Sequence, residues 1–430
     1  MATSRNRVIY QSEALFVSPT ATGGHYTGAD RVISNTSTDG TAYADGSCLR
    51  QIKRVQSANY SFTVNRQDVN EYGQLARIDS VVVDTPTVNM DFSYYVTDGE
   101  NERLLGFVID GLTNSMSGQM SPLVGGRGQN YFILTVPEGQ DAIKGDLTST
   151  NSEKSVISLG NGFITDYSVE ASVGGMPTAS VSVEGFNIKS DTGYAALGIP
   201  AIDPQDGSKI CDSKFTIPAA TSGDGISCLR PGDIVIDLKN AALMSKQVSG
   251  KATDPVQGSA HIQSVSINIP MSRTVLQRLG NTFGFARELD VPITATMTVN
   301  ALVADLKDSD QHKTNMLDLL CGNQKKDLKV TMHDPACIQC GYNKPTGMIF
   351  TLKGAQLESE SYSSSIGDNK TVDLTFTAQI GGPTDADAGV FISGSNSDQD
   401  TNKGRPPEVV GSVLTYWEPV DERYPNGTPS

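Results

Sequence analysis

The chain has 430 residues, a formal net charge of −15, and 42 glycines and 20 prolines. This length is enough for two domains with separate cores. The negative charge excludes ordinary nucleic-acid recognition, which needs Lys and Arg to displace phosphate counterions. No stretch approaches 18 apolar residues and the start, MATSRNRVIY, has no apolar region, so we expect neither a membrane span nor a signal peptide.

The first half of the chain reads as strands, one short helix and a hairpin. Apolar residues alternate with polar ones around residues 55–63 and 87–95, which is the pattern of half-buried β-strands. The apolar residues of these and a later strand are expected to point into the core, namely Tyr60, Phe62, Val88, Met90, Phe92, Val181 and Val183. An acidic start followed by Leu104, Leu105 and Val108 then predicts a short amphipathic helix. Further alternating strands flank Gly174-Gly175, which predicts a tight hairpin turn.

The same order of elements recurs in the second half. Residues 55–98 align without a gap on residues 262–305, and the period-2 alternation keeps its phase. A slip of one residue would turn every apolar side chain to the wrong face, so the preserved phase predicts a preserved sheet. Upstream, Ala14-Leu15-Phe16 matches Ala242-Leu243-Met244. Downstream, a helix is expected within 308–322 and a second hairpin at Gly367-Asp368.

We therefore predict a mainly β chain with two tandem β-sandwich domains, each with one short helix. The first domain covers residues 1–188 and the second 231–382. Residues 189–230 and 383–430 are rich in Gly, Pro, Asp and Ser, which favours a linker and a C-terminal extension.

The sequence contains no recognisable catalytic motif. Its four histidines are far apart, and none lies in a nucleophile or metalloprotease motif, so we predict no catalytic residues and no cofactor. Cys321, His333, Cys337 and Cys340 are the one set with ligand spacing. They fit tetrahedral zinc or, alternatively, free cysteines in a loop. Six cysteines in a chain without a secretion signal are expected to be reduced.

The polar sides of the predicted strands carry Ser, Thr, Asn and carboxylates, with no Lys or Arg. Solvent-exposed faces ordinarily mix both signs of charge. One reading is an exposed sheet selected for β-propensity. Another is a surface with a specific task. Seven of the larger polar residues of these strands are singled out, Asn59, Asn89, Asp91, Glu170, Glu184, Asn268 and Asp373.

Four stretches of the chain resemble the major tail tube proteins of tailed bacteriophages. They are YQSEALFVSP, RVQSANYSFTVNRQDVNEYG, PTVNMDFSYYVTDG and GFITDYSVEASVGGMPTASVSVEGFNI, and the resemblance is strongest over residues 8–188. It implies sandwiches whose inner sheets join those of neighbouring copies into a barrel that lines a tube. With two domains in one chain, three chains would close a ring with pseudo-sixfold symmetry. The alternative is a ring of six chains.

The resemblance also implies roles for residues and partners. The seven polar residues would face the lumen, where DNA passes without specific binding. Residues 65–85 and 272–292 would contact the adjacent ring, the first through Leu75, Ile78, Val81, Val82 and Val83. Expected partners are sheath, tape-measure, baseplate and tail-terminator proteins, in a virion tail assembled in the host cytoplasm. The rival hypotheses are a two-domain β-sandwich adhesin or tail-associated binding protein, and a polysaccharide-degrading enzyme with Asp91 and Glu170 as paired carboxylates.

Overall fold

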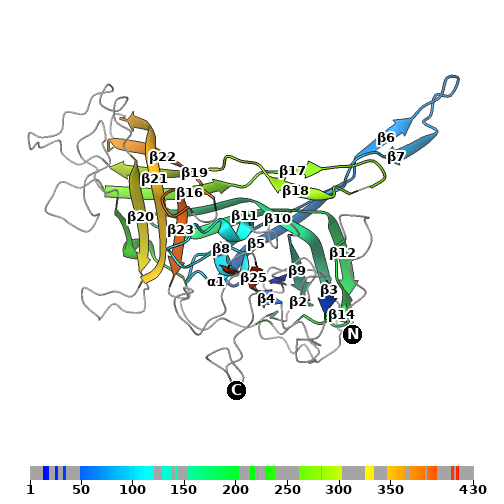
Figure 1. The fold of residues 1–430 in the computed structure, drawn as a ribbon, viewed down its shortest axis with the longest axis horizontal. Coiled ribbons are helices and arrows are strands. Elements are labelled where there is room, and N and C mark those ends of the chain that lie inside the picture. The colour runs from blue at the N-terminus through cyan, green and yellow to red at the C-terminus, as the bar shows by residue number, and fades with distance from the viewer. Residues whose placement is uncertain are drawn as a thin grey trace, which may run out of the picture.

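A computed structural model shows a mainly β chain, which confirms the predicted fold class (Figure 1). In Figure 1 two adjoining groups of strands lie under one long sheet, and a hairpin extends away from its end. The structure describes residues 13–18, 25–27, 32–34, 49–120, 128–137, 141–142, 154–202, 214–217, 220, 228–237, 261–281, 283–302, 325–333, 346–364, 369–382, 385–394, 408–410 and 413–415.

The first unit has two sheet layers that share one long strand. One layer has the order β5-β8-β11-β10, and the other has β4-β1-β9-β10-β12. The N-terminal part of β10 pairs with β9 and β12, and its C-terminal part pairs with β11. The strands are β1 (Glu13–Ser18), β4 (Arg50–Gln51), β5 (Val55–Thr63), β8 (Thr87–Tyr95), β9 (Gln129–Thr135), β10 (Ser155–Ser172), β11 (Thr178–Gly185) and β12 (Asn187–Thr192). The helices are α1 (Glu100–Leu104) and α2 (Ser117–Met120).

The second unit has the same layout. Its layers have the orders β16-β19-β22-β21 and β15-β20-β21-β23, and β21 is the long shared strand. The strands are β15 (Ile234–Asp237), β16 (His261–Pro270), β19 (Thr294–Leu302), β20 (Lys326–His333), β21 (Thr346–Ser363), β22 (Thr371–Gln379) and β23 (Gly389–Gly394). A 3-10 helix, η3 (Pro231–Asp233), precedes β15.

Corresponding strands of the two units pair in the same register. Each unit has an irregularity near the start of one end strand of the layer described above, β5 or β16, and another in the middle of its long strand. The matching pairs are Ser57 with Ser93 and Ser264 with Asn300, then Tyr167 with Val181 and Glu360 with Leu374. The gapless alignment of 55–98 on 262–305 therefore coincides with the backbone pairing.

The two units are joined edge to edge. The C-terminal half of β10 pairs with β16, from Asp166 opposite Pro270 to Ser172 opposite Ser264. As a result β5-β8-β11-β10-β16-β19-β22-β21 form one continuous row, called here the eight-strand sheet. The row thus passes from β10 of the first unit to β16 of the second.

Two hairpins extend from the eight-strand sheet and are called the arms. The first arm is β6 (Arg66–Val69) with β7 (Asp79–Val82), and the second is β17 (Arg273–Leu276) with β18 (Ala286–Leu289). The remaining strand pairs are short. They are β2 (His25–Thr27) with β3 (Val32–Ser34), β13 (Leu197–Gly198) with β14 (Lys214–Phe215), and β24 (Glu408–Val410) with β25 (Val413–Thr415).

The predicted linker and extension both contribute to the folded units. The range 189–230 includes most of β12, and its Leu197 and Ile217 are buried in a cluster with Phe16 and Phe132. The range 383–430 includes β23, which pairs with β21 and is buried over 389–392. The Gly and Pro content of both ranges favours loops, and neither strand is long enough to show clear alternation. Each strand is instead fixed by pairing along a long partner, β12 with β10 and β23 with β21.

Parts of the predicted second domain lie outside the described residues. These include Ala242-Leu243-Met244, the helix expected within 308–322 and the turn at Gly367-Asp368. The strand that corresponds to β1 is instead β15, since Ile236 lies opposite Val330 as Leu15 lies opposite Ile133.

The apolar side of the eight-strand sheet forms the main core. Val88, Met90, Phe92, Val181 and Val183 are buried in it, as predicted. The same prediction is wrong for two residues of β5. Tyr60 is 47 % exposed and Phe62 is 62 % exposed, because β5 ends the row of strands and only one of its edges is covered.

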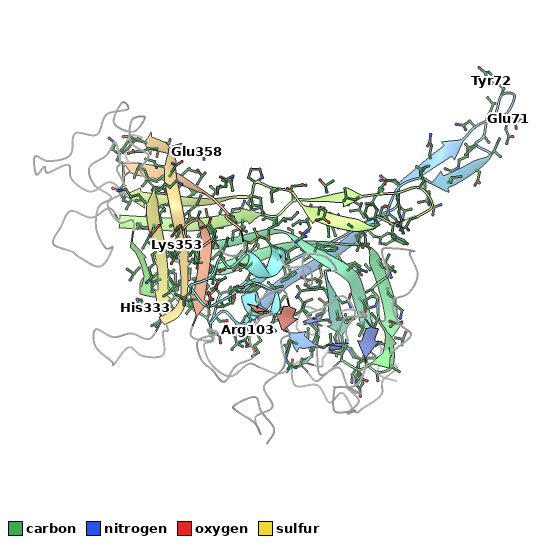
Figure 2. The ribbon with its side chains drawn as sticks, viewed as in Figure 1. Glu71, Tyr72, Arg103, His333, Lys353 and Glu358 are labelled. Atoms are coloured by element: carbon green, nitrogen blue, oxygen red, sulfur yellow. The ribbon has the colours of Figure 1, made fainter. Side chains whose placement is uncertain are left out.

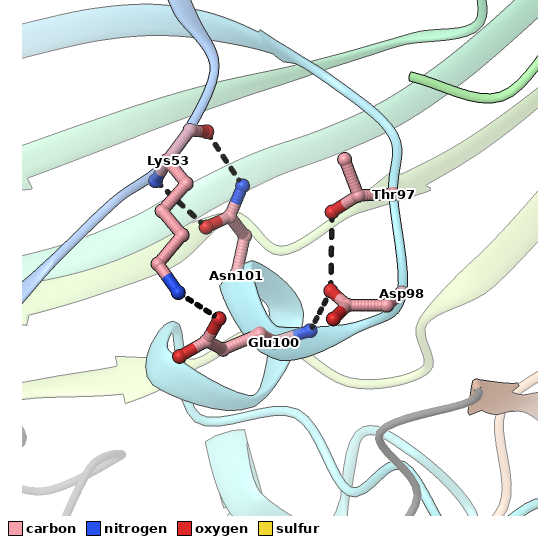
Figure 3. Close-up of polar contacts among 5 residues, drawn as sticks. All are labelled: Lys53, Thr97, Asp98, Glu100 and Asn101. Atoms are coloured by element: carbon pink, nitrogen blue, oxygen red, sulfur yellow. Dashed lines mark hydrogen bonds and ion pairs between the residues drawn. The ribbon is translucent and has the colours of Figure 1, made fainter. Parts of the chain in front are cut away.

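Helix α1 is anchored to the segment before β5 (Figure 3). Asp98 Oδ1 accepts hydrogen bonds from the Glu100 N–H (3.2 Å) and the Thr97 hydroxyl (3.1 Å), so it satisfies a donor of the first turn. Asn101 exchanges two hydrogen bonds of 2.9 Å with the Lys53 backbone, and the Lys53 ammonium lies 2.6 Å from Glu100 Oε2. These contacts fix the helix under the eight-strand sheet.

The anchored helix places one carboxyl group in the core. The hydroxyls of Tyr94 and Tyr167 donate to Glu102 Oε1 at 2.9 and 3.1 Å. Burial raises the pKa of Glu102 to about 7, and the hydrogen bonds from the two tyrosines oppose this rise only in part.

We expect Glu102 to make the folded chain less stable as pH rises from about 5 to 7.5. The folded state keeps a proton that the unfolded state releases above the ordinary value of 4.5. The loss should be about 2–3 kcal/mol of unfolding free energy. Urea unfolding at the two pH values measures it. Glu102→Gln keeps an acceptor for both tyrosines and should remove most of this pH dependence. An unchanged pH dependence in that variant would contradict the assignment.

Candidate assembly surfaces

The outward face of the eight-strand sheet is polar across both units. One row of directly opposed residues crosses every strand without a charged or apolar side chain. It consists of Ser57, Ser93, Ser180, Ser168, Asn268, Thr296, Thr377 and Gln356. The row passes from the first unit to the second at Ser168 and Asn268. The polar face therefore continues across the joint.

Six of the seven residues predicted to face a lumen lie on this face with no basic residue bonded to them in the described part of the chain. Asn59, Asp91, Glu170 and Asn268 are exposed, and Asn89 and Asp373 are partly buried. The pleat places each of them on the side of the serine and threonine row. Two neighbours on the same face donate to members of this group, Ser182 Oγ to Asp91 Oδ1 (2.7 Å) and Asn300 Nδ2 to Asp373 Oδ1 (2.5 Å).

Glu184, the seventh, lies under the second arm. Its Oε2 is 2.5 Å from Nη1 of Arg287 on β18, whose guanidinium is buried and lies 4.8 Å from the centre of the Phe186 ring. Desolvation lowers the pKa of Arg287, and the charge of Glu184 opposes that shift. The Glu184 carboxylate is thus matched by a cation, unlike the carboxylates of Asp91 and Glu170.

The eight-strand sheet ends at two strands that correspond to the joined pair inside the chain. β5 matches β16, and residues 356–363 of β21 match the half of β10 that pairs with β16. Tyr60 and Phe62 of β5 are exposed, whereas their counterparts Ile267 and Ile269 are 3 % and 0 % exposed.

The other end shows the same contrast. Tyr362 of β21 is 42 % exposed, and its counterpart Val169 in β10 is 2 % exposed. Apolar side chains that are covered at the internal joint are therefore exposed at both outer ends. Exposed edges of this kind can accept a further strand.

The backbone of β5 has donors that face outward. Two hydrogen bonds bracket the internal joint, from Met271 N to Thr165 O (2.8 Å) and from Val173 N to Gln263 O (2.9 Å). Since hydrogen-bonded pairs alternate in an antiparallel ladder, Ile267 and Ile269 also direct their N–H groups toward β10. By the same register, the N–H groups of Tyr60 and Phe62 point away from β8.

The two arms have different surroundings. The second arm lies on the first unit through Arg287 and through Arg273, whose guanidinium is 5.1 Å from the centre of the Phe163 ring. The first arm extends from the end of the sheet, with Glu71 and Tyr72 near its tip (Figures 1 and 2). Of the residues predicted to contact another ring, Leu75, Ile78, Val81 and Val83 are exposed and Val82 is partly buried.

Comparisons with known proteins give structural neighbours but no sequence family. No protein-family model matches the chain, and no curated protein matches it. Solved structures similar to parts of the chain include the tail of an empty gene transfer agent particle, refined with C6 symmetry (12 % identity, TM-score 0.21). It aligns over 34 % of this chain and 92 % of its own.

Two further structures are similar at the same level. The SPP1 tail tube has 11 % identity and a TM-score of 0.24 over 44 % of this chain and 98 % of its own. The virion of a native gene transfer agent particle has 12 % identity and a TM-score of 0.19 over 37 % and 97 %.

The described residues give no support for a metal site or for a membrane-spanning helix. Among them, no three His, Cys, Asp or Glu side chains are grouped so that they could hold a metal ion. Of the candidate zinc ligands, His333 ends β20, whereas Cys321, Cys337 and Cys340 lie outside the described residues. Among the helices described, none is long and apolar enough to cross a membrane.

Proposed function

We propose that the chain is a tail tube subunit whose copies join head to tail into rings, and that the rings stack into a tube. One observation carries the proposal. The strand pair that joins the two units inside the chain, β10 with β16, has its counterparts at the two outer ends, β21 and β5. A second copy can therefore add its β5 to β21 by repeating a contact that the chain already makes.

The proposed contact is heterologous, because it joins two different edges of the same molecule. Such contacts produce a closed ring when the rotation per copy divides a full turn. The internal joint would set this rotation, since it relates the two units in the same manner. With two units in each chain, three chains would close a ring of six units. A ring of six chains is the alternative.

The polar face would line the channel of this ring. The residues of the eight strands include no Lys or Arg where they form this face, so a passing duplex meets hydroxyls, amides and the carboxylates of Asp91, Glu170 and Asp373. Repeated Lys or Arg contacts would hold DNA through counterion release. A wall of this composition would let DNA leave a capsid without specific binding.

Contacts between rings would come from the exposed tips of the arms. Within a virion tail, which would assemble in the host cytoplasm, the tube would meet sheath, tape-measure, baseplate and tail-terminator proteins. We propose no enzymatic step and no cofactor for this role.

Electron microscopy and native mass measurement of the purified chain test the proposal together. We expect hollow tubes or rings, with a mass of three chains per ring. A chain that stays monomeric at high concentration and binds glycans would instead favour the adhesin. Rings of six chains would be consistent with a tail tube subunit, but they would refute the proposal that the two units occupy equivalent positions around the axis.

A further inference from the structure

The two arms are the same structural element in different surroundings. Arg66 lies opposite Val82 in the first arm, and the corresponding pair in the second is Arg273 with Leu289. A glycine with positive φ occupies the same place in each tip, Gly73 at 93° and Gly280 at 86°. The two arms are therefore alike in register and tip geometry and differ in what surrounds them.

The second arm shows which contacts hold an arm in place. At its base, Arg273 and Arg287 are buried against Phe163 and Phe186. Further out, Gln277 Nε2 donates to Asp84 Oδ1 at 2.7 Å and to Thr85 Oγ1 at 3.2 Å, across a cleft between the two arms. These hydrogen bonds connect the second arm to the base of the first.

Beyond the contacts of Gln277 at its base, the first arm makes no hydrogen bond with either unit among the described residues. Arg66 and Ile78 are exposed, whereas their counterparts Arg273 and Phe285 are buried and partly buried. The arm begins where β5 ends. In the proposed ring, β5 lies beside β21 of the next copy, so the arm would start directly over the second unit of that copy.

The second unit presents a suitable surface at this place. The counterparts of Phe163 and Thr165 in β21 are Gln356 and Glu358, and both side chains are exposed. Figure 2 shows Glu358 at the edge of the second unit. The Glu358 carboxylate matches the positive charge of Arg66. Further out, the counterpart of Asp84 is Val291, which is 75 % exposed.

We infer that the base of the first arm lies across the second unit of the neighbouring copy within the same ring. There Arg66 would approach Gln356 and Glu358, and Asn70, the counterpart of Gln277, would approach Val291. This inference rests on the proposed function, and it revises the expectation that the whole segment 65–85 contacts the adjacent ring. Only the tip would remain for that contact. Leu279, in the tip of the docked second arm, is indeed fully exposed.

Cysteine cross-linking of assembled tubes tests the inference. Asn70→Cys combined with Val291→Cys, treated with a short bis-maleimide, should give interchain products at least about tenfold above either single variant. Because each contact would lie within a ring, the covalent series should end at three chains. Products longer than one ring would place the arm on the adjacent ring and overturn the inference.

A second cysteine pair separates failure of the arm contact from failure of the ring. Tyr60→Cys with Tyr362→Cys replaces the counterparts of Ile267 and Val169, which are directly opposed at the internal joint. Products from this pair without products from Asn70→Cys and Val291→Cys would support the head-to-tail ring and refute the arm contact. Products from neither pair would refute the head-to-tail ring itself. The unmodified chain controls for its own cysteines.

Discussion

Tyr60→Pro should leave a folded chain that forms neither rings nor tubes. Proline has no backbone N–H, but it is tolerated in an end strand where that group points outward. The Tyr60 N–H is directed away from β8, so the ladder inside the chain stays intact, while the proposed ladder to β21 loses a bond and an aromatic contact. We expect a loss of about 2–4 kcal/mol per contact, which raises the dissociation constant about 30- to 1,000-fold.

Circular dichroism and urea unfolding would establish that the variant is folded, and sedimentation with electron microscopy would report assembly. Tyr60→Ile is the matched control, because it installs the residue type found at the internal joint, Ile267. It should assemble normally. If Tyr60→Pro formed tubes of ordinary yield and length, β5 would not be part of the contact between copies.

The combined substitutions Asp91→Lys and Glu170→Lys should give tubes that retain duplex DNA. Both carboxylates are exposed on the polar face, in strands that lie on either side of β11. Each chain would gain four units of positive charge on that face, repeated in every ring. Retention of short duplexes should fall by about a thousandfold between 50 and 200 mM salt, because the binding depends on released counterions.

Co-sedimentation of tubes with labelled duplex DNA measures this retention. The neutral pair Asp91→Asn and Glu170→Gln should assemble and retain no more DNA than the parent chain. Asp141→Lys adds a positive charge at an exposed position between β9 and β10, outside the strands of the eight-strand sheet, and controls for binding outside the channel. Equal retention by the Asp141 variant would show that the polar face is not where DNA passes.

Much of the fold follows from alternation along the sequence. The phase of apolar residues placed β5, β8, β16 and β19 correctly, and it put Asp91, Glu170 and Asn268 on one face. Alternation gives the two faces of a strand but does not say which strands end a sheet. This is why Tyr60 and Phe62 were expected in the core. They are exposed because β5 lies at the end of the row, and in the proposed ring a neighbouring copy would cover them.

The arm contacts could not have been derived in the same way. Arg273 and Arg287 are separated from Phe163 and Glu184 by about a hundred residues, and their proximity requires the β10–β16 pairing. One signal was present, because Arg66 and Arg273 are identical in the repeat. It indicated a shared task for the two positions without indicating the surface on which that task is performed.

The β10–β16 joint also bears on how fast an assembly could begin. In a ring of six separate units, every joint must form by diffusion, and the concentration of complete rings depends steeply on the concentration of units. Here half of the joints in a three-chain ring would already be made when each chain folds. Ring formation would then need only two successive encounters, so tubes should nucleate at chain concentrations too low for single-unit subunits with the same edge affinity.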